Sequence, residues 1–155
     1  MMKLNVRTWL AGVAVASALT LAACGGGGGG GGAAAPSSVN VSTAGESLAF
    51  APAQLSANAG DVKVTFKNGS TAQKHNWVLV KGGDAEASKV DEAAVAAGEA
   101  AGYIPSDPAI LAKTKLVDGA ATDSITFKAE PGTYTYLCTF PGHYAAGMKG
   151  TLTVK

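Results

Sequence analysis

The chain has 155 residues, of which 47% are hydrophobic and only 15% are charged, and its formal net charge is +1. This size and composition predict one folded domain with an N-terminal appendage, and the lack of a basic stripe argues against nucleic acid as a partner. Without Lys3 and Arg7 of the leader, ten Lys face eleven Asp and Glu, so the net charge becomes −1. We therefore do not expect partner binding to depend on one large electrostatic field.

The first 23 residues have the pattern of an export signal. Lys3 and Arg7 precede an apolar run over residues 9–21 that is too short to be a comfortable membrane span. The run ends in Leu-Ala-Ala before Cys24, which resembles the lipidation signal of bacterial lipoproteins. We expect residues 1–23 to be a lipoprotein signal peptide and Cys24 to carry a membrane-anchoring lipid. An ordinary signal peptide or an uncleaved anchor are the alternatives.

Residues 24–37 are expected to form the lipidated cysteine and a flexible tether. Eight consecutive glycines occupy residues 25–32, and such a segment cannot bury enough apolar surface to become ordered. The square-root rule for glycine-rich chains gives this segment a reach of roughly 20 Å. The folded domain is expected to cover residues 38–155.

Alternating apolar and polar residues predict several short strands in that domain. The clearest covers residues 61–67, where Val62, Val64 and Phe66 face one way, and Asn68 to Ser70 then has the composition of a turn. Further strand candidates are residues 39–42, 48–50, 54–57, 76–80, 110–117, 122–127, 133–138 and 150–154.

The exception to the strand pattern is an alanine-rich segment, residues 88–101, which predicts a helix. Ser88 and Asp91 resemble a capping box, and Gly102 is a natural stop. Together these patterns predict an all-β fold, an antiparallel β-sandwich with Greek-key connections and one helical insertion.

Four possible metal ligands stand out in this scaffold. Cys138, His143 and Met148 lie within eleven residues between two predicted strands, and His75 lies upstream. Taken singly, each would more often be a packing or surface residue. However, His75 and His143 are the only histidines, and Cys138 is the only thiol apart from Cys24. An unpaired cysteine in an exported protein indicates a reactive or metal-bound thiol.

The donor types favour copper. Two imidazoles, one thiolate and a weak axial thioether are the ligand set of a blue-copper electron-transfer site. Zinc is the competing metal, but it prefers Cys, His and carboxylate ligands, and no Asp or Glu lies between Cys138 and Lys155.

Several segments resemble those of azurins, namely residues 74–79, 113–116, 123–127 and 138–143. The resemblance is closer to auracyanins, the azurin-like blue copper proteins of certain anoxygenic phototrophs. Like them, this chain has His-Asn-Trp-Val-Leu-Val at residues 75–80 and one residue more between His143 and Met148 than azurins have.

This resemblance implies a cupredoxin fold and one copper ion that cycles between Cu(I) and Cu(II). It implies the ligands His75, Cys138, His143 and Met148. It also implies hydrogen bonds from Asn76 and nearby backbone amides around the thiolate. Where azurins have a glycine before the first ligand, this chain has Lys74.

The function implied is that of a monomeric electron carrier rather than an enzyme. It would move single electrons between membrane-bound redox complexes on the outer, periplasmic face of the cytoplasmic membrane. The resemblance suggests a menaquinol-oxidising complex as donor and a reaction-centre cytochrome or a terminal oxidase as acceptor. Electrons would leave at His143, with the uncharged residues around it as a docking patch.

Two other functions are weighed against electron transfer. A copper enzyme would need an open coordination position and further histidines, which this chain lacks. Copper storage or delivery is the main alternative, although it would favour clusters of exchangeable Met or His ligands.

Overall fold

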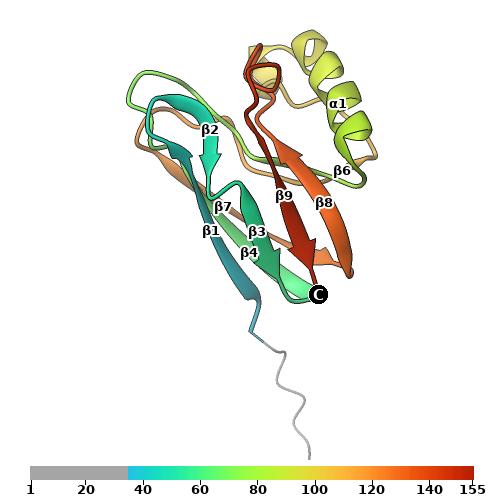
Figure 1. Cartoon of the computed structure of the whole chain (residues 1–155). Helices are drawn as coiled ribbons and strands as arrows, with labels where there is room; N and C mark the ends of the chain where they lie inside the picture. The colour runs from blue at the N-terminus through green and yellow to red at the C-terminus, as the bar shows by residue number, and fades with distance from the viewer. Residues whose placement is uncertain (1–34) are drawn as a thin grey trace, which may run out of the picture. The chain divides into compact units, whose positions relative to one another are not determined.

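Two β-sheets pack face to face in the computed structural model, which describes residues 35–155 (Figure 1). The expected signal peptide, Cys24 and the glycine run lie outside these residues. The first sheet has the order β2-β1-β4-β7, with β1 Ser37–Ala44, β2 Ser47–Ala51, β4 Gly60–Lys67 and β7 Thr122–Ala129. The second has the order β3-β9-β8-β5-β6, with β3 Gln54–Ala57, β5 Val78–Val80, β6 Ile110–Lys113, β8 Gly132–Leu137 and β9 Lys149–Val154. The prediction of a β-sandwich with one helical insertion is confirmed.

The sequence predicted an antiparallel sandwich, but two of the strand pairs are parallel. β1 pairs with β4 in parallel, and β3 pairs with β9 in parallel. The cause is a strand switch: β3 belongs to the second sheet, whereas its chain neighbours β2 and β4 belong to the first. The chain therefore crosses from one sheet to the other and back before β4 starts, and β4 returns in the direction of β1.

The core lies between the two sheets. In β4, Val62, Val64 and Phe66 are fully buried, whereas the intervening Lys63 is exposed, as the alternation predicted. Aromatic rings from both sheets join them and pack edge to face or tilted: the Phe50 and Tyr136 centroids are 5.0 Å apart, and those of Trp77 and Tyr136 are 5.5 Å apart. This packing gives the metal-site residues a rigid base.

Helix α1 (Asp84–Ala97) covers the outer face of β5, so all three residues of this strand are buried. The prediction of a helix over residues 88–101 was wrong in its bounds. The chain becomes helical directly after Gly83, whose N–H donates to the Glu86 carboxylate at 3.2 Å. Ser88, expected as the cap, donates instead to Glu92 at 3.2 Å.

The far end of the helix also differs from the prediction. α1 ends at Gly98, which has a positive φ of 73°, and only a short 3-10 turn, η1 (Glu99–Ala101), follows before Gly102. Gly98 ends the α-helix early because its backbone, with this φ and a ψ of 173°, has a non-helical conformation that favours glycine.

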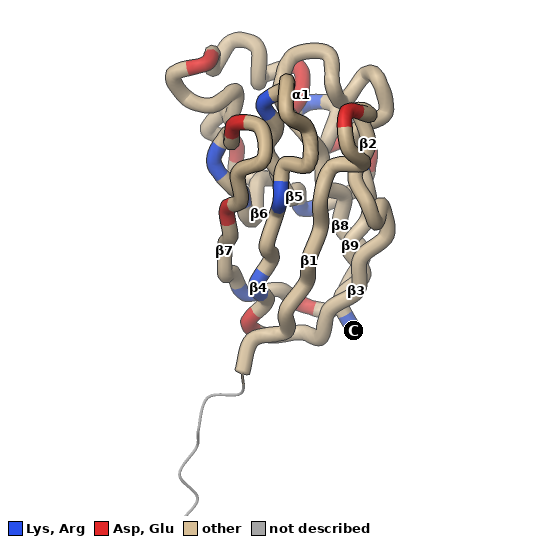
Figure 2. Tube along the Cα trace, turned by 90° about the vertical axis from the view of Figure 1, so that its left-hand side faces the viewer, with Lys and Arg blue, Asp and Glu red and all other residues tan. Residues whose placement is uncertain are grey.

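The loop between β8 and β9 lies at the same end of the sandwich as α1, and the C-terminus lies at the opposite end, where β1 also begins (Figure 1). Acidic and basic residues are interspersed over the side seen in Figure 2 rather than gathered by sign. Among residues 35–155, no helix is both long and apolar enough to cross a membrane.

Candidate metal centre

Three of the four predicted donors converge at the end of the sandwich that carries α1. The donor atoms of His75, Cys138 and His143 all lie within 4.8 Å of one another. The Cys138 sulfur is 3.7 Å from His75 Nδ1 and 3.5 Å from His143 Nδ1, and the two Nδ1 atoms are 3.1 Å apart. All three side chains are buried, and His143 is the most accessible with 6% of its surface exposed.

Met148, the fourth predicted donor, is fully buried. In the chain it follows His143, from which four residues separate it. Its backbone N–H donates to the His143 carbonyl at 2.9 Å, and its carbonyl accepts from the Cys138 N–H at 3.1 Å. These two bonds close the loop onto itself, so the three loop donors are attached to one hydrogen-bonded unit. Gly147 has a φ of +100°, a conformation that glycine adopts without strain just before Met148.

His75 reaches the cluster from another part of the chain. It forms an isolated bridge with Val117: the His75 N–H donates to the Val117 carbonyl at 3.1 Å, and the Val117 N–H donates to the His75 carbonyl at 2.9 Å. The backbone around the imidazole is thereby fixed by bonds within the protein.

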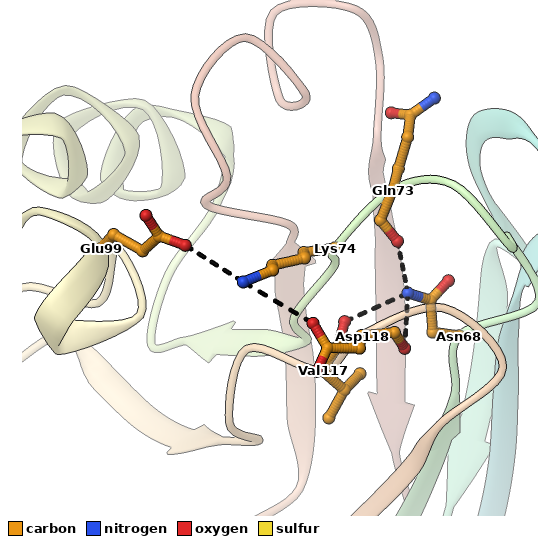
Figure 3. A network of polar contacts seen from close by, with 6 residues as sticks. All are labelled: Asn68, Gln73, Lys74, Glu99, Val117 and Asp118. Carbon is orange, nitrogen blue, oxygen red and sulfur yellow. Dashed lines mark hydrogen bonds and ion pairs between the residues drawn. The ribbon is translucent and has the colours of Figure 1, made fainter.

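A buried amide holds these two segments together. The Asn68 side-chain NH₂ donates to the carbonyls of Gln73, Val117 and Asp118 at 2.7, 3.1 and 3.1 Å (Figure 3). Asn68 is fully buried, and its side-chain oxygen accepts from the Ser70 N–H at 3.0 Å. Sequence reasoning took Asn68 for a turn residue, because an Asn-Gly pair gives no signal of such long-range bonds.

Lys74 turns away from the donors toward two acidic residues. Its ammonium group is 3.1 Å from Glu99 and 3.6 Å from Asp118, as Figure 3 shows. The lysine that replaces the azurin glycine therefore links η1 to the loop before β7. Such exposed ion pairs contribute little stability, so this contact mainly orients the lysine.

Polar groups surround the Cys138 sulfur. The backbone N–H groups of Asn76 and Phe140 act to lower the pKa of its thiol. The Asn76 side chain donates to Thr139 Oγ1 at 2.8 Å and to the Gly102 carbonyl at 3.0 Å, and it accepts from the Thr139 N–H at 2.8 Å. The resemblance implied hydrogen bonds from Asn76 around the thiolate, and its side chain bonds to Thr139, the residue after Cys138. Thr139 was not foreseen.

Burial decides the protonation of the metal-free donors. It raises the pKa of the Cys138 thiol to about 11, against the effect of the two backbone N–H groups. It lowers the pKa of His75 to about 4, with a smaller contribution from His143, and also lowers the pKa of His143. At neutral pH the imidazoles are therefore uncharged and can offer lone pairs, whereas the thiol must lose a proton to bind a metal.

The chemistry of this donor set fits a copper ion. One sulfur and two neutral ring nitrogens face one another with no carboxylate among them, and thiolate with imidazole is a set that copper accepts in both oxidation states. His75 Nε2 is buried and has no hydrogen-bond partner within residues 35–155, so the ring has no competing contact that would turn Nδ1 away.

Comparison with known proteins extends these observations. The family model described as copper binding proteins of the plastocyanin/azurin family matches residues 37–155. Auracyanin-A of Chloroflexus aurantiacus is 45% identical over 162 residues, covering 99% of each chain. Auracyanin-B of the same organism is 47% identical over 121 residues, covering 76% of this chain and 52% of the relative.

Solved structures show the same likeness. The structure of auracyanin A, titled a "blue" copper protein of a green thermophilic photosynthetic bacterium, has a TM-score of 0.74 at 45% identity and covers 78% of this chain and 100% of its own. Dithionite-reduced auracyanin from the photosynthetic bacterium Roseiflexus castenholzii has a TM-score of 0.73 at 46% identity, covering 76% and 96%.

Proposed function

Because this chain belongs to the plastocyanin/azurin family of copper-binding proteins, we propose that His75, Cys138 and His143 bind one copper ion, with Met148 as a weaker fourth ligand. Membership in this blue copper family implies electron transfer, and copper is the cofactor. The single observation that carries the ligand assignment is the convergence of one sulfur and two ring nitrogens at 3.1–3.7 Å.

Bound copper would supply a one-electron redox couple, and the protein would supply fixed ligand positions. The Asn76, Val117 and Met148 hydrogen bonds hold the donors without help from the metal. Little movement is then needed when the charge changes, which lowers the barrier to electron exchange. Backbone N–H groups stabilise the negative charge of the sulfur.

Electrons would exchange through His143, the ligand nearest the surface. Its ring lies against Phe140, with centroids 4.6 Å apart. The neighbouring Gly142, Ala145 and Ala146 are exposed and uncharged. A surface of small uncharged residues loses little hydration on docking, which suits a transient redox complex with a small interface.

The wider setting is part of the same proposal. We infer a carrier, not an enzyme, that links a menaquinol-oxidising complex to a reaction-centre cytochrome or a terminal oxidase. The two auracyanins compared above come from photosynthetic bacteria, which supports this setting. Copper storage or delivery is the alternative. Slow copper loss to a chelator together with fast electron exchange would favour the carrier, and the reverse would favour delivery.

We further propose that the protein is exported and held on the outer face of the cytoplasmic membrane by a lipid on Cys24. β1 begins at the end of the sandwich opposite the β8–β9 loop (Figure 1). An anchor reaching the domain at that end would leave the metal-site loop free to meet membrane-bound partners.

The two cysteines allow a reciprocal test. Cys138→Ser is expected to abolish the intense visible absorption of the copper(II) protein while the protein stays in the membrane fraction. Cys24→Ser is expected to keep the absorption and release the protein into the soluble fraction. A blue Cys138→Ser protein would overturn the copper–thiolate assignment, and a membrane-bound Cys24→Ser protein would overturn the lipid anchor.

A further inference from the structure

The start of α1 is fastened to the metal-site loop by a single carboxylate. Asp84 is the first residue of α1. The Tyr144 hydroxyl donates to Asp84 Oδ1 at 2.7 Å and lies 3.2 Å from the Asp84 carbonyl. The Lys149 ammonium donates to the same Oδ1 at 2.7 Å. This ammonium also lies over the Tyr144 ring, 5.1 Å from its centre, so the three side chains contact one another in a closed triangle.

The positions of the two donors in the sequence indicate what this triangle of side chains does. Tyr144 directly follows His143, and Lys149 directly follows Met148. One carboxylate on the helix thus holds the neighbours of both metal-site residues, at the two ends of the segment between them. We propose that Asp84 is a positioning residue that fixes the separation of His143 and Met148 at the copper site. This inference rests on the ligand set proposed above.

The segment between these ends needs such support. Ala145, Ala146 and Gly147 are small and exposed, so they provide few side-chain contacts that could hold the loop. Apart from side chains, the segment is held by backbone bonds: Ala146 donates to Gly142 at 3.1 Å, Gly147 to Tyr144 at 2.8 Å, and Met148 to His143 at 2.9 Å. Residues that orient metal ligands from outside often affect metal affinity strongly, although they do not touch the metal.

The Tyr144 ring adds an apolar contact to the same connection. It packs against a buried cluster formed by β5, β8 and α1, whose members include Val80, Ala87 and Val90. Because the ring is held by the helix, its hydroxyl points at the start of α1. The helical insertion therefore acts on the loop through one apolar and one charged contact.

A simpler role for Asp84 must be separated from this one. An acidic residue in the first turn of a helix interacts favourably with the helix dipole. Glu86 lies in the same turn and accepts from the Gly83 N–H, but contacts neither Tyr144 nor Lys149. Asp84→Ala and Glu86→Gln remove the same charge from the same turn, and the glutamine oxygen can still accept from the Gly83 N–H, so Glu86→Gln is the matched control.

The experiment uses the full-length copper protein. The rate of copper loss to an excess of a Cu(I)-selective chelator is measured together with the visible spectrum and the reduction potential. We expect Asp84→Ala to lose copper about tenfold faster than wild type, with a shifted potential, and Glu86→Gln to match wild type. Tyr144→Phe and Lys149→Met should each give part of this effect, and adding Tyr144→Phe to Asp84→Ala should change little further.

Amide hydrogen exchange of the copper-free proteins provides a second readout. Residues 144–148 should exchange faster in Asp84→Ala than in Glu86→Gln, while exchange in β4 stays unchanged in both. Equal copper loss and equal loop exchange in these two variants would overturn the positioning role. A wild-type protein without intense visible absorption would instead overturn the ligand set, and with it the role of Asp84 toward copper.

Discussion

His75 is the most deeply buried imidazole of the site, and burial together with His143 lowers its pKa to about 4 in the metal-free protein. In the unfolded chain the value returns to about 6.5. Between pH 6.5 and about pH 4, the unfolded chain therefore binds a proton at His75 that the folded protein does not bind. The stabilising contribution of the neutral ring is complete above pH 6.5 and is lost progressively between pH 6.5 and 4.

We accordingly predict that acid weakens the copper-free protein through His75. Its free energy of unfolding should fall by up to about 3 kcal/mol between pH 7 and pH 4 on account of this group. Urea unfolding at a series of pH values measures the loss, and His75→Gln is the reference because it cannot titrate. Identical pH profiles for the two proteins would contradict the prediction.

Asn68 shows why residue type alone did not reveal the whole site. The four donors could be predicted because Cys, His and Met have chemistry that the spacing makes specific. Asn68 is of a residue type that is common in turns, yet its NH₂ group faces three carbonyl oxygens in the interior. Which carbonyls an amide meets depends on how distant loops approach each other, and the local sequence does not record it.

Asn68→Asp should therefore be more damaging than its similar shape suggests. At neutral pH a carboxylate would face those carbonyl oxygens without a donor, and an uncompensated buried charge costs about 3–5 kcal/mol. Asn68→Ala leaves the carbonyls unpaired without adding charge and should cost about 2–3 kcal/mol. Unfolding by denaturant measures the free energy of unfolding of both variants.

The exposed Asn58 provides the matched control for this comparison. Asn58→Asp is expected to change stability by less than about 0.5 kcal/mol. The difference in the free energy of unfolding between Asn68→Asp and Asn68→Ala should become smaller in acid, because protonation of the aspartate removes the buried charge. Equal stability of these two variants at pH 7 would contradict the account.

Among the elements, strands were predicted better than the helix. Alternation fixes which strand residues face the core, and β4 follows it closely. The helix began four residues earlier than expected, at Asp84, because the Glu86 carboxylate binds the Gly83 N–H. Asp84 and Glu86 lie between the Gly82–Gly83 pair and the residue at which the helix was predicted to start. The missed first turn is also the one that contacts the metal-site loop.

β9 depends on a glycine where it leaves that loop. Gly150 lies opposite Tyr136 in the β8–β9 pair, and a Cβ there would overlap the Tyr136 ring and the Ala53 carbonyl oxygen. Tyr136 cannot move aside, because its ring is fully buried and its hydroxyl donates to the Pro52 carbonyl at 3.0 Å. Gly150→Ala should therefore force the strands apart.

We predict that Gly150→Ala lowers the free energy of unfolding by about 3 kcal/mol or abolishes folding. Gly83→Ala is the comparison, because a Cβ at that position meets open space. Its cost should be limited to a poorer helix cap, about 1 kcal/mol. Chemical denaturation measures both, and a Gly150→Ala protein as stable as Gly83→Ala would show that the strands tolerate the overlap.

For the molecule as a whole, the sequence predicted a sandwich but not which strands pair. Apolar alternation identifies the face that each strand buries and says nothing of its neighbours, so the parallel β1/β4 and β3/β9 pairs were not foreseen. The site depends on this global arrangement. His75 and the β8–β9 loop meet only because β5 lies beside β8 in the second sheet.

The copper-free protein should consequently keep its fold, since hydrogen bonds within the protein already hold the donors. The Asn76–Thr139, His75–Val117 and Cys138–Met148 bonds join protein groups to one another and do not use the metal. Copper binds the folded state selectively, so it adds stability by mass action, about 4 kcal/mol at a free concentration a thousand times the Kd.

Removing copper should lower the unfolding temperature while the amide NMR spectrum stays dispersed, with shifts confined to the neighbourhood of the cluster. Copper should raise the unfolding temperature of Cys138→Ser far less. Collapse of the amide dispersion in the metal-free wild type would mean instead that the ion organises the sandwich.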